Sequence, residues 1–168
     1  MDEGTLDTLG ERDRLVRGAR YGLDATAVMT LVMLLGMLVS WGRLRPFPFL
    51  IASRAVVHGS RVWVLPLTIL GHFAFGTLAG MVFAYFSRPM TRAKGIGWGA
   101  LLWFFMQITF VPWIGWMDFG LDRSRGLTFY FLLLHLVYGY TLGSLGARDE
   151  RAHHVRFDDL GRLAYHSP

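Results

Sequence analysis

Two histidines in this sequence begin the same short pattern inside uncharged, apolar sequence. His72 starts His-Phe-Ala-Phe-Gly-Thr-Leu-Ala-Gly, and His135 starts His-Leu-Val-Tyr-Gly-Tyr-Thr-Leu-Gly. Both copies read His-x-x-aromatic-Gly-x-x-x-Gly, which we call the histidine–glycine motif. An imidazole can ligate a metal or carry a proton, and within apolar sequence it is costly unless a partner accepts it. Glycines at this spacing let another helix approach closely. The motif therefore indicates either ligand chemistry or helix packing.

Helix packing is the first interpretation. At helical spacing each histidine shares a face with both glycines of its own motif. The glycines would let two helices touch, and each neutral imidazole would hydrogen-bond a neighbour, a bond worth about 1 kcal/mol in lipid. The predicted packing residues are Gly76, Gly80, Gly139 and Gly143, and the candidate partners of the imidazoles are Thr30, Thr68, Gln107 and Thr109.

Cofactor ligation is the second interpretation. Two histidines at one depth on parallel helices could hold one haem iron from opposite sides, with the glycines making room for the macrocycle. Alternatively, each could hold the magnesium of a chlorin. His72 and His135 are therefore the candidate cofactor-binding residues, and haem or a chlorin is the candidate cofactor. A proton or ion pathway is a third interpretation, but such pathways usually carry a mid-span carboxylate, and no apolar run has one.

Other catalytic patterns are missing from the sequence. The chain has no cysteine, which excludes thiolate nucleophiles and thiolate metal sites. It has no histidine–glutamate zinc motif, nucleotide loop or serine elbow. Asp118 and Asp122 are expected in a solvated turn, paired with a nearby arginine; a metal or catalytic pair with His58 is the alternative. We predict that the protein is not an enzyme and has no metal site.

Long apolar runs must position these residues. Hydrophobic residues make up 53% of the chain and charged residues 17%, below the roughly 25% usual for soluble domains. A helix needs about 20 mostly apolar residues to cross a bilayer, and continuous runs of this kind exclude a transmembrane barrel. The predicted fold is all-α, a four-helix transmembrane bundle. The predicted spans are 21–41, 62–86, 96–117 and 127–147.

Polar sequence flanks the predicted transmembrane domain, 21–147. We expect a polar cytoplasmic segment over 1–20, a cytoplasmic tail over 148–168, and a short interfacial helix within 45–58. Two internal prolines are expected to kink their spans, and four tryptophans are expected at the outer interface. The prolines are Pro66 and Pro112, and the tryptophans are Trp41, Trp63, Trp113 and Trp116.

The basic residues predict orientation. Of the 17 Lys and Arg residues, eleven fall in the N-terminal segment, the second connection and the tail. Because positive charge accumulates on the cytoplasmic side, both termini are predicted to lie in the cytoplasm of a prokaryote, with the protein in its inner membrane. The net charge of +5 does not indicate nucleic acid, because the arginines cluster at the ends of apolar runs.

A set of short stretches occurs along the predicted spans, and its most specific member is His135-Leu136-Val137-Tyr138-Gly139. The others are Ala25-Thr26-Ala27-Val28-Met29-Thr30, Gly71-His72-Phe73 with Gly76, then Gly97, Gly99 and Trp103, and Pro112. Together they resemble a family of small four-helix membrane proteins of bacteria and archaea whose function is unknown. The resemblance covers about 20–147. It implies the four-helix fold and carries no activity, cofactor or partner.

These features predict a non-catalytic accessory or structural subunit of a larger membrane complex, for example an energy-transducing one. Its expected partners are the lipid bilayer and other membrane subunits. The first alternative is a haem- or chlorin-binding subunit for electron transfer or pigment binding that uses His72 and His135. The second alternative is a small transporter or channel, which would need polar side chains along a path through the spans.

Overall fold

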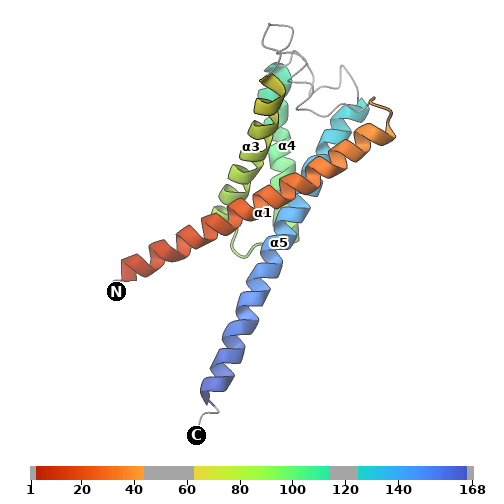
Figure 1. The fold of residues 1–168 in the computed structure, drawn as a ribbon. Coiled ribbons are helices and arrows are strands. Elements are labelled where there is room, and N and C mark those ends of the chain that lie inside the picture. Colours follow the sequence, from red (N-terminus) through yellow and green to blue (C-terminus); the bar gives the residue numbers. More distant parts are fainter. Residues whose placement is uncertain (1–2, 44–62, 114–124, 166–168) are drawn as a thin grey trace.

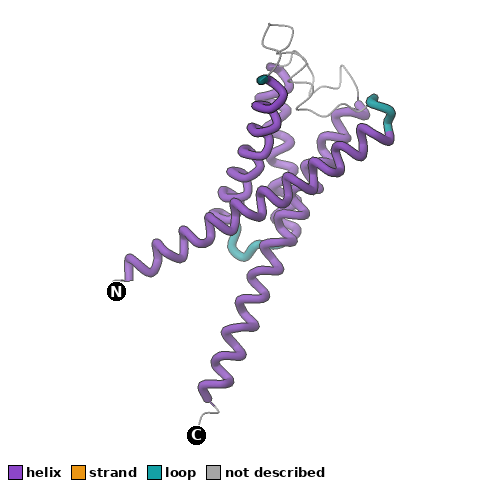
Figure 2. The backbone as a smooth tube through the Cα atoms, in the orientation of Figure 1, coloured by secondary structure: helices purple, strands orange, loops and turns teal. Residues whose placement is uncertain are grey.

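The computed structural model describes residues 3–43, 63–113 and 125–165, and the side chains of 10–43, 63–112 and 125–152. This part of the chain is helical, with short turns and no strand (Figure 2). The four helices of this part are long and apolar enough to cross a membrane, so the prediction of an all-helical fold with four helices of spanning length is confirmed. The helices are α1 (Glu3–Val39), α3 (Val64–Phe86), α4 (Arg92–Trp113) and α5 (Arg125–Tyr165).

Two helices are longer than the predicted spans. Helix α1 already begins at Glu3, and its candidate span is Gly10–Val39. Helix α5 runs from Arg125 to Tyr165, well past the predicted span end at 147. The sequence predicted a polar segment over 1–20 and a tail over 148–168. The described parts of both segments continue the helices α1 and α5. The expected interfacial helix, Asp118 with Asp122, His58 and Trp116 lie outside the described residues.

The two span prolines stand at helix ends. Pro66 is in the first turn of α3, where a missing backbone N–H costs nothing because that N–H has no helical acceptor. Pro112 is the last residue but one of α4, so it can affect only the final turn. The expected kinks within the spans therefore have no interior proline to cause them. Trp41 and Trp63 also lie at helix ends, and both are exposed.

The helices form a ring of neighbours. Helix α1 packs against α3 and α5, and α4 packs against α5. Aromatic rings join α3 to α4: Phe83 and Trp98 have centroids 6.2 Å apart, and Phe75 meets Phe110 at 6.4 Å. Figure 1 shows the two chain ends and the α3–α4 connection at one end of the bundle. Helices α3 and α5 therefore run in the same direction.

Large apolar side chains cover much of the outside. Leu31 is 67% exposed, Leu38 74% and Phe86 75%. The buried core is narrow, with Phe83 and Leu142 among its fully buried side chains. An apolar surface of this extent is unusual on a soluble monomer and is what helices facing lipid tails present.

Candidate functional site

The glycines of the first histidine–glycine motif lie against the backbone of α1. A Cβ atom at Gly80 would stand 2.5 Å from the carbonyl oxygen of Gly18, and one at Gly22 would stand 2.6 Å from that of Gly76. Backbone atoms cannot rotate away as a side chain can, so a larger residue would push α1 and α3 apart. Gly76 itself is covered by the hydroxyl of Thr26.

The glycines of the second motif lie against α4 in the same way. A Cβ atom at Gly143 would stand 2.5 Å from the carbonyl oxygen of Thr91, and Gly139 and Gly95 face each other. A Cβ atom at Gly99 would overlap the carbonyl of His135. All four glycines named from the sequence thus lie in close helix contacts.

The partner glycines on α1 and α4 were not among the packing residues predicted from the sequence. They form a second repeated pattern, Gly-x-x-aromatic-Gly, over Gly18–Gly22 and Gly95–Gly99. The spacing of this pattern is a signal for close packing. In the sequence the signal is weak, because Gly18 falls in a charged segment where close helix packing is not expected.

The structure divides the bundle into two similar halves, each a pair of helices in contact through glycines. The first half is α1 with α3, and the second is α4 with α5. Each motif is also followed by one more small residue, four positions after its last glycine. This residue is Ala84 after Gly80 and Ala147 after Gly143. Ala84 is fully buried and lies next to Gly18.

His72 is tied to α1 by a hydrogen bond. Its Nε2 lies 3.2 Å from the hydroxyl of Thr30, one of the four partners expected from the sequence. Thr30 donates its own hydrogen to the carbonyl of Thr26, at 2.7 Å. Because that hydrogen is already used, His72 Nε2–H is the donor to Thr30. The electron pair of His72 therefore lies on Nδ1.

His135 has the opposite tautomer. Its Nδ1 lies 2.8 Å from the carbonyl oxygen of Phe131, in the preceding turn of α5. A carbonyl only accepts, so Nδ1 carries the hydrogen and Nε2 keeps its electron pair. The indole N–H of Trp103, one turn beyond Gly99 on α4, is buried without an acceptor among the described residues.

Two other candidate partners form bonds within their own helices. Thr68 donates to the carbonyl of Val64 at 2.7 Å and Thr109 to that of Phe105 at 2.6 Å, each within its own helix. Gln107 is buried. Within the described residues, no group of three or more His, Cys, Asp or Glu side chains could hold a metal ion.

The glycine faces do not provide room for a macrocycle. The face at Gly76 is filled by Thr26, and the face at Gly139 is filled by Gly95 and Gly99. A haem lying along either face would have to displace a helix backbone. Only the unprotonated nitrogens, Nδ1 of His72 and Nε2 of His135, therefore favour the binding of a tetrapyrrole.

Two tyrosines of α5 connect the halves. The hydroxyl of Tyr138 donates to the carbonyl of Gly76 at 2.6 Å, and that of Tyr130 donates to the carbonyl of Met33 at 2.8 Å. Tyr138 belongs to the second histidine–glycine motif and Gly76 to the first, so the two motifs are in direct contact. A larger residue at Gly36 would meet the Tyr130 hydroxyl, which explains why glycine is suited to that place.

A polar cluster closes the end of the bundle where α3 connects to α4. Arg14 donates to the carbonyls of Ala84 and Ser87, the latter at 2.9 Å, at the end of α3 where helical carbonyls lack partners. Both carboxylate oxygens of Glu150 accept from the backbone N–H of Met90 at 3.0 Å. The sequence predicted that Arg14 and Glu150 lie in segments that flank the spans. In the structure they hold the α3–α4 connection against α1 and α5.

One ion pair also joins α1 to α5 in this cluster. A carboxylate oxygen of Asp149 lies 3.6 Å from Nε of Arg17, and Asp149 also hydrogen-bonds the side chain of Tyr21. Arg17 and Asp149 are each more than a quarter exposed, so the pair contributes little by itself. Its effect is to fix the register of the two helices.

Comparisons with protein-family models, with curated proteins and with solved structures found no match to this chain.

Proposed function

We propose that this chain is an integral membrane protein that serves as a non-catalytic subunit of a larger membrane assembly. Four helices of spanning length and an apolar exterior support the membrane location. The excess of basic residues at the end that holds both termini supports a cytoplasmic position for that end. A prokaryotic inner membrane is the location we infer.

The observation that carries the subunit role is the length of α5. This helix runs without a break to Tyr165, beyond the predicted span end at 147, and extends past the other three helices (Figure 1). A helix gains most of its stability from tertiary packing, and the far part of α5 has no neighbouring helix from this chain in Figure 1. Contact with another subunit would supply that packing.

Truncation tests the subunit role. Full-length protein and a variant ending at Ala152 should be purified from native membranes in mild detergent and compared by native mass measurement. We expect the full chain to retain another membrane protein at fixed stoichiometry and the truncated chain to lose it. The truncated chain should keep its melting temperature and lose only the helicity of the removed segment. A full-length chain that is a stable monomer, or a truncated chain that keeps its partner, would contradict the proposal.

Haem or chlorin binding is the second candidate, and the free Nε2 of His135 is what favours it. A ligating histidine commonly donates its other N–H to a carbonyl, as His135 does to Phe131. The filled glycine faces argue against it. An absorption spectrum decides: a Soret or chlorin band that disappears in His135→Gln supports ligation, and a spectrum without either band removes this candidate.

A further inference from the structure

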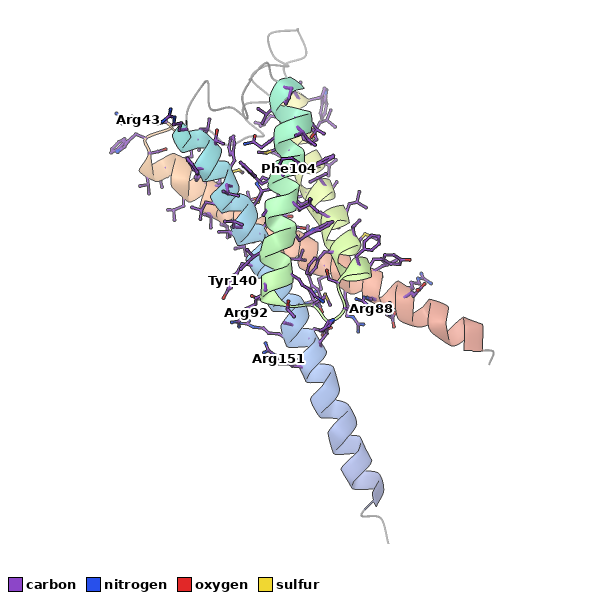
Figure 3. All side chains as sticks on the ribbon, turned by 180° about the vertical axis from the view of Figure 1, so that it is seen from behind. Arg43, Arg88, Arg92, Phe104, Tyr140 and Arg151 are labelled. Atoms are coloured by element: carbon purple, nitrogen blue, oxygen red, sulfur yellow. The ribbon has the colours of Figure 1, made fainter. Side chains whose placement is uncertain are left out.

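Three side chains lie along one side of the α4–α5 pair. The guanidinium carbon of Arg92 is 5.8 Å from the ring centroid of Tyr140, and Figure 3 shows Arg92, Tyr140 and Arg151 on that side. Tyr140 and Arg151 are separated by about three helical turns, so they share a face of α5. We call this group the basic flank.

Both arginines of the basic flank lie toward the end of the bundle that holds the α3–α4 connection. Arg92 begins the candidate span of α4, and its Cα lies beside Gly143 of α5. Arg151 follows Gly143 by about two turns of α5, roughly 12 Å. In a bilayer, Arg92 would therefore lie at the edge of the apolar layer and Arg151 farther out among the lipid headgroups. Tyr140 is about half exposed, and a half-exposed aromatic ring near an arginine is typical of this level.

The nearby acids are committed to other groups. Asp149 pairs with Arg17 and bonds Tyr21, and Glu150 accepts from the backbone N–H of Met90. Among the described side chains, no carboxylate lies within ion-pair distance of Arg92 or Arg151. The flank therefore carries positive charge that the described part of the protein does not neutralise.

The same face of α5 becomes apolar farther from the basic flank. Leu133 and Phe129 precede Tyr140 by about two and three turns, and they are 53% and 64% exposed. The exposed surface thus passes from apolar to aromatic to cationic along one face of one helix. This order matches an amphiphile with an anionic head.

We propose that Arg92, over the ring of Tyr140, binds the phosphate headgroup of an anionic phospholipid, with the acyl chains along Leu133 and Phe129 and with Arg151 adding attraction from farther out. The proposal rests on the membrane location proposed above and is independent of the subunit role. Arginine donates to phosphate oxygens in a bidentate geometry, and basic residues at an anionic membrane surface each contribute attraction.

Lipid retention in native mass spectrometry tests the site. The full-length protein should be titrated with phosphatidylglycerol or phosphatidylcholine of identical acyl chains. We expect preferential retention of phosphatidylglycerol, a loss of affinity of about fivefold for Arg92→Gln, and a smaller loss for Arg151→Gln. Arg88→Gln is the matched control, since Arg88 is exposed at the same end but on the other side of the molecule, and Arg43→Gln controls for the opposite end (Figure 3).

Several other results would overturn the proposed lipid site. Equal retention of the two lipids, or an equal loss in Arg88→Gln, would overturn the site. Displacement of the lipid by inorganic phosphate at matched concentration would show a phosphate site without a lipid requirement and would also overturn it. Carbonate extraction of the protein from membranes would instead disprove the membrane location, whereas loss of partner proteins alone would concern only the subunit role.

Discussion

At the scale of single residues, hydrogen bonds to backbone carbonyls define the centre of this protein. Tyr138 donates to the carbonyl of Gly76, and the tautomers of His72 and His135 follow from what Thr30 and Phe131 can accept. The sequence indicated that both histidines needed partners and included Thr30 among the candidates. It could not identify the bond of Tyr138, because an aromatic residue in an apolar run is consistent with either lipid contact or a buried hydroxyl.

Tyr138→Phe should lower the free energy of unfolding by about 1 kcal/mol. The substitution removes the hydroxyl but leaves the Gly76 carbonyl its helical hydrogen bond, so no buried group loses its only partner. Detergent-titration unfolding measures the change. Tyr140→Phe is the control, because Tyr140 is half exposed and keeps its ring under Arg92; an equal loss there would contradict the role of the Tyr138 hydroxyl.

Thr30→Val should release His72 and cost about 1 kcal/mol of stability. Valine has nearly the same shape but cannot accept from Nε2–H. Nitrogen NMR of labelled histidine should report the Nε2–H tautomer of His72 in the original chain and a mixture of tautomers in the variant. Thr109→Val removes a comparable bond within one helix and should leave the His72 signals unchanged. Identical spectra in all three proteins would count against the assigned bond.

At the scale of helices, glycine decides which pairs come into closest contact. Gly80 meets Gly18 and Gly22, and Gly143 meets Gly95. In lipid, apolar surface provides little drive for association, so close backbone approach and its van der Waals contact take that role. The sequence predicted the motif glycines as packing residues. The sequence could not identify the neighbouring helix, because a glycine face permits close packing against any helix.

Gly80→Ala should destabilise the bundle by about 1–3 kcal/mol, because its methyl group would overlap the backbone of Gly18 and Gly22. Gly71→Ala on the same helix is the matched control. A Cβ atom at Gly71 meets nothing within 4 Å, so that variant should be neutral or slightly stabilised. Unfolding curves of the two variants measured side by side provide the comparison, and equal stabilities would refute the close contact of α1 and α3.

At the scale of the whole molecule, two glycine-packed halves meet through α1 and α5. The tyrosine bonds of α5 and the ion pair of Arg17 with Asp149 join the halves. Each half has its own close helix contact and could form before the two meet. In the sequence, this division corresponds to the two copies of the histidine–glycine motif, one in each half.

The halves should assemble when expressed as separate chains. We expect fragments 1–88 and 89–168 to co-purify through a tag on one of them, because the contacts between halves do not require the peptide bond. Replacing Tyr130 and Tyr138 together by Phe should reduce recovery of the untagged fragment, while Tyr140→Phe should not. Recovery of the tagged fragment alone from the original pair would show that the halves depend on covalent connection.

The sequence by itself determined that four helices form and that each is long and apolar enough to span a membrane. The reason is local: an apolar backbone run must satisfy its own hydrogen bonds, and a helix does so within one segment. Only the tertiary structure decided that Gly18 and Gly95 complete the packing faces, that Glu150 holds Met90, and that the two motifs touch through Tyr138 and Gly76. These contacts join residues far apart in the chain, and their partners are selected by the shape and register of whole helices, which no single segment specifies.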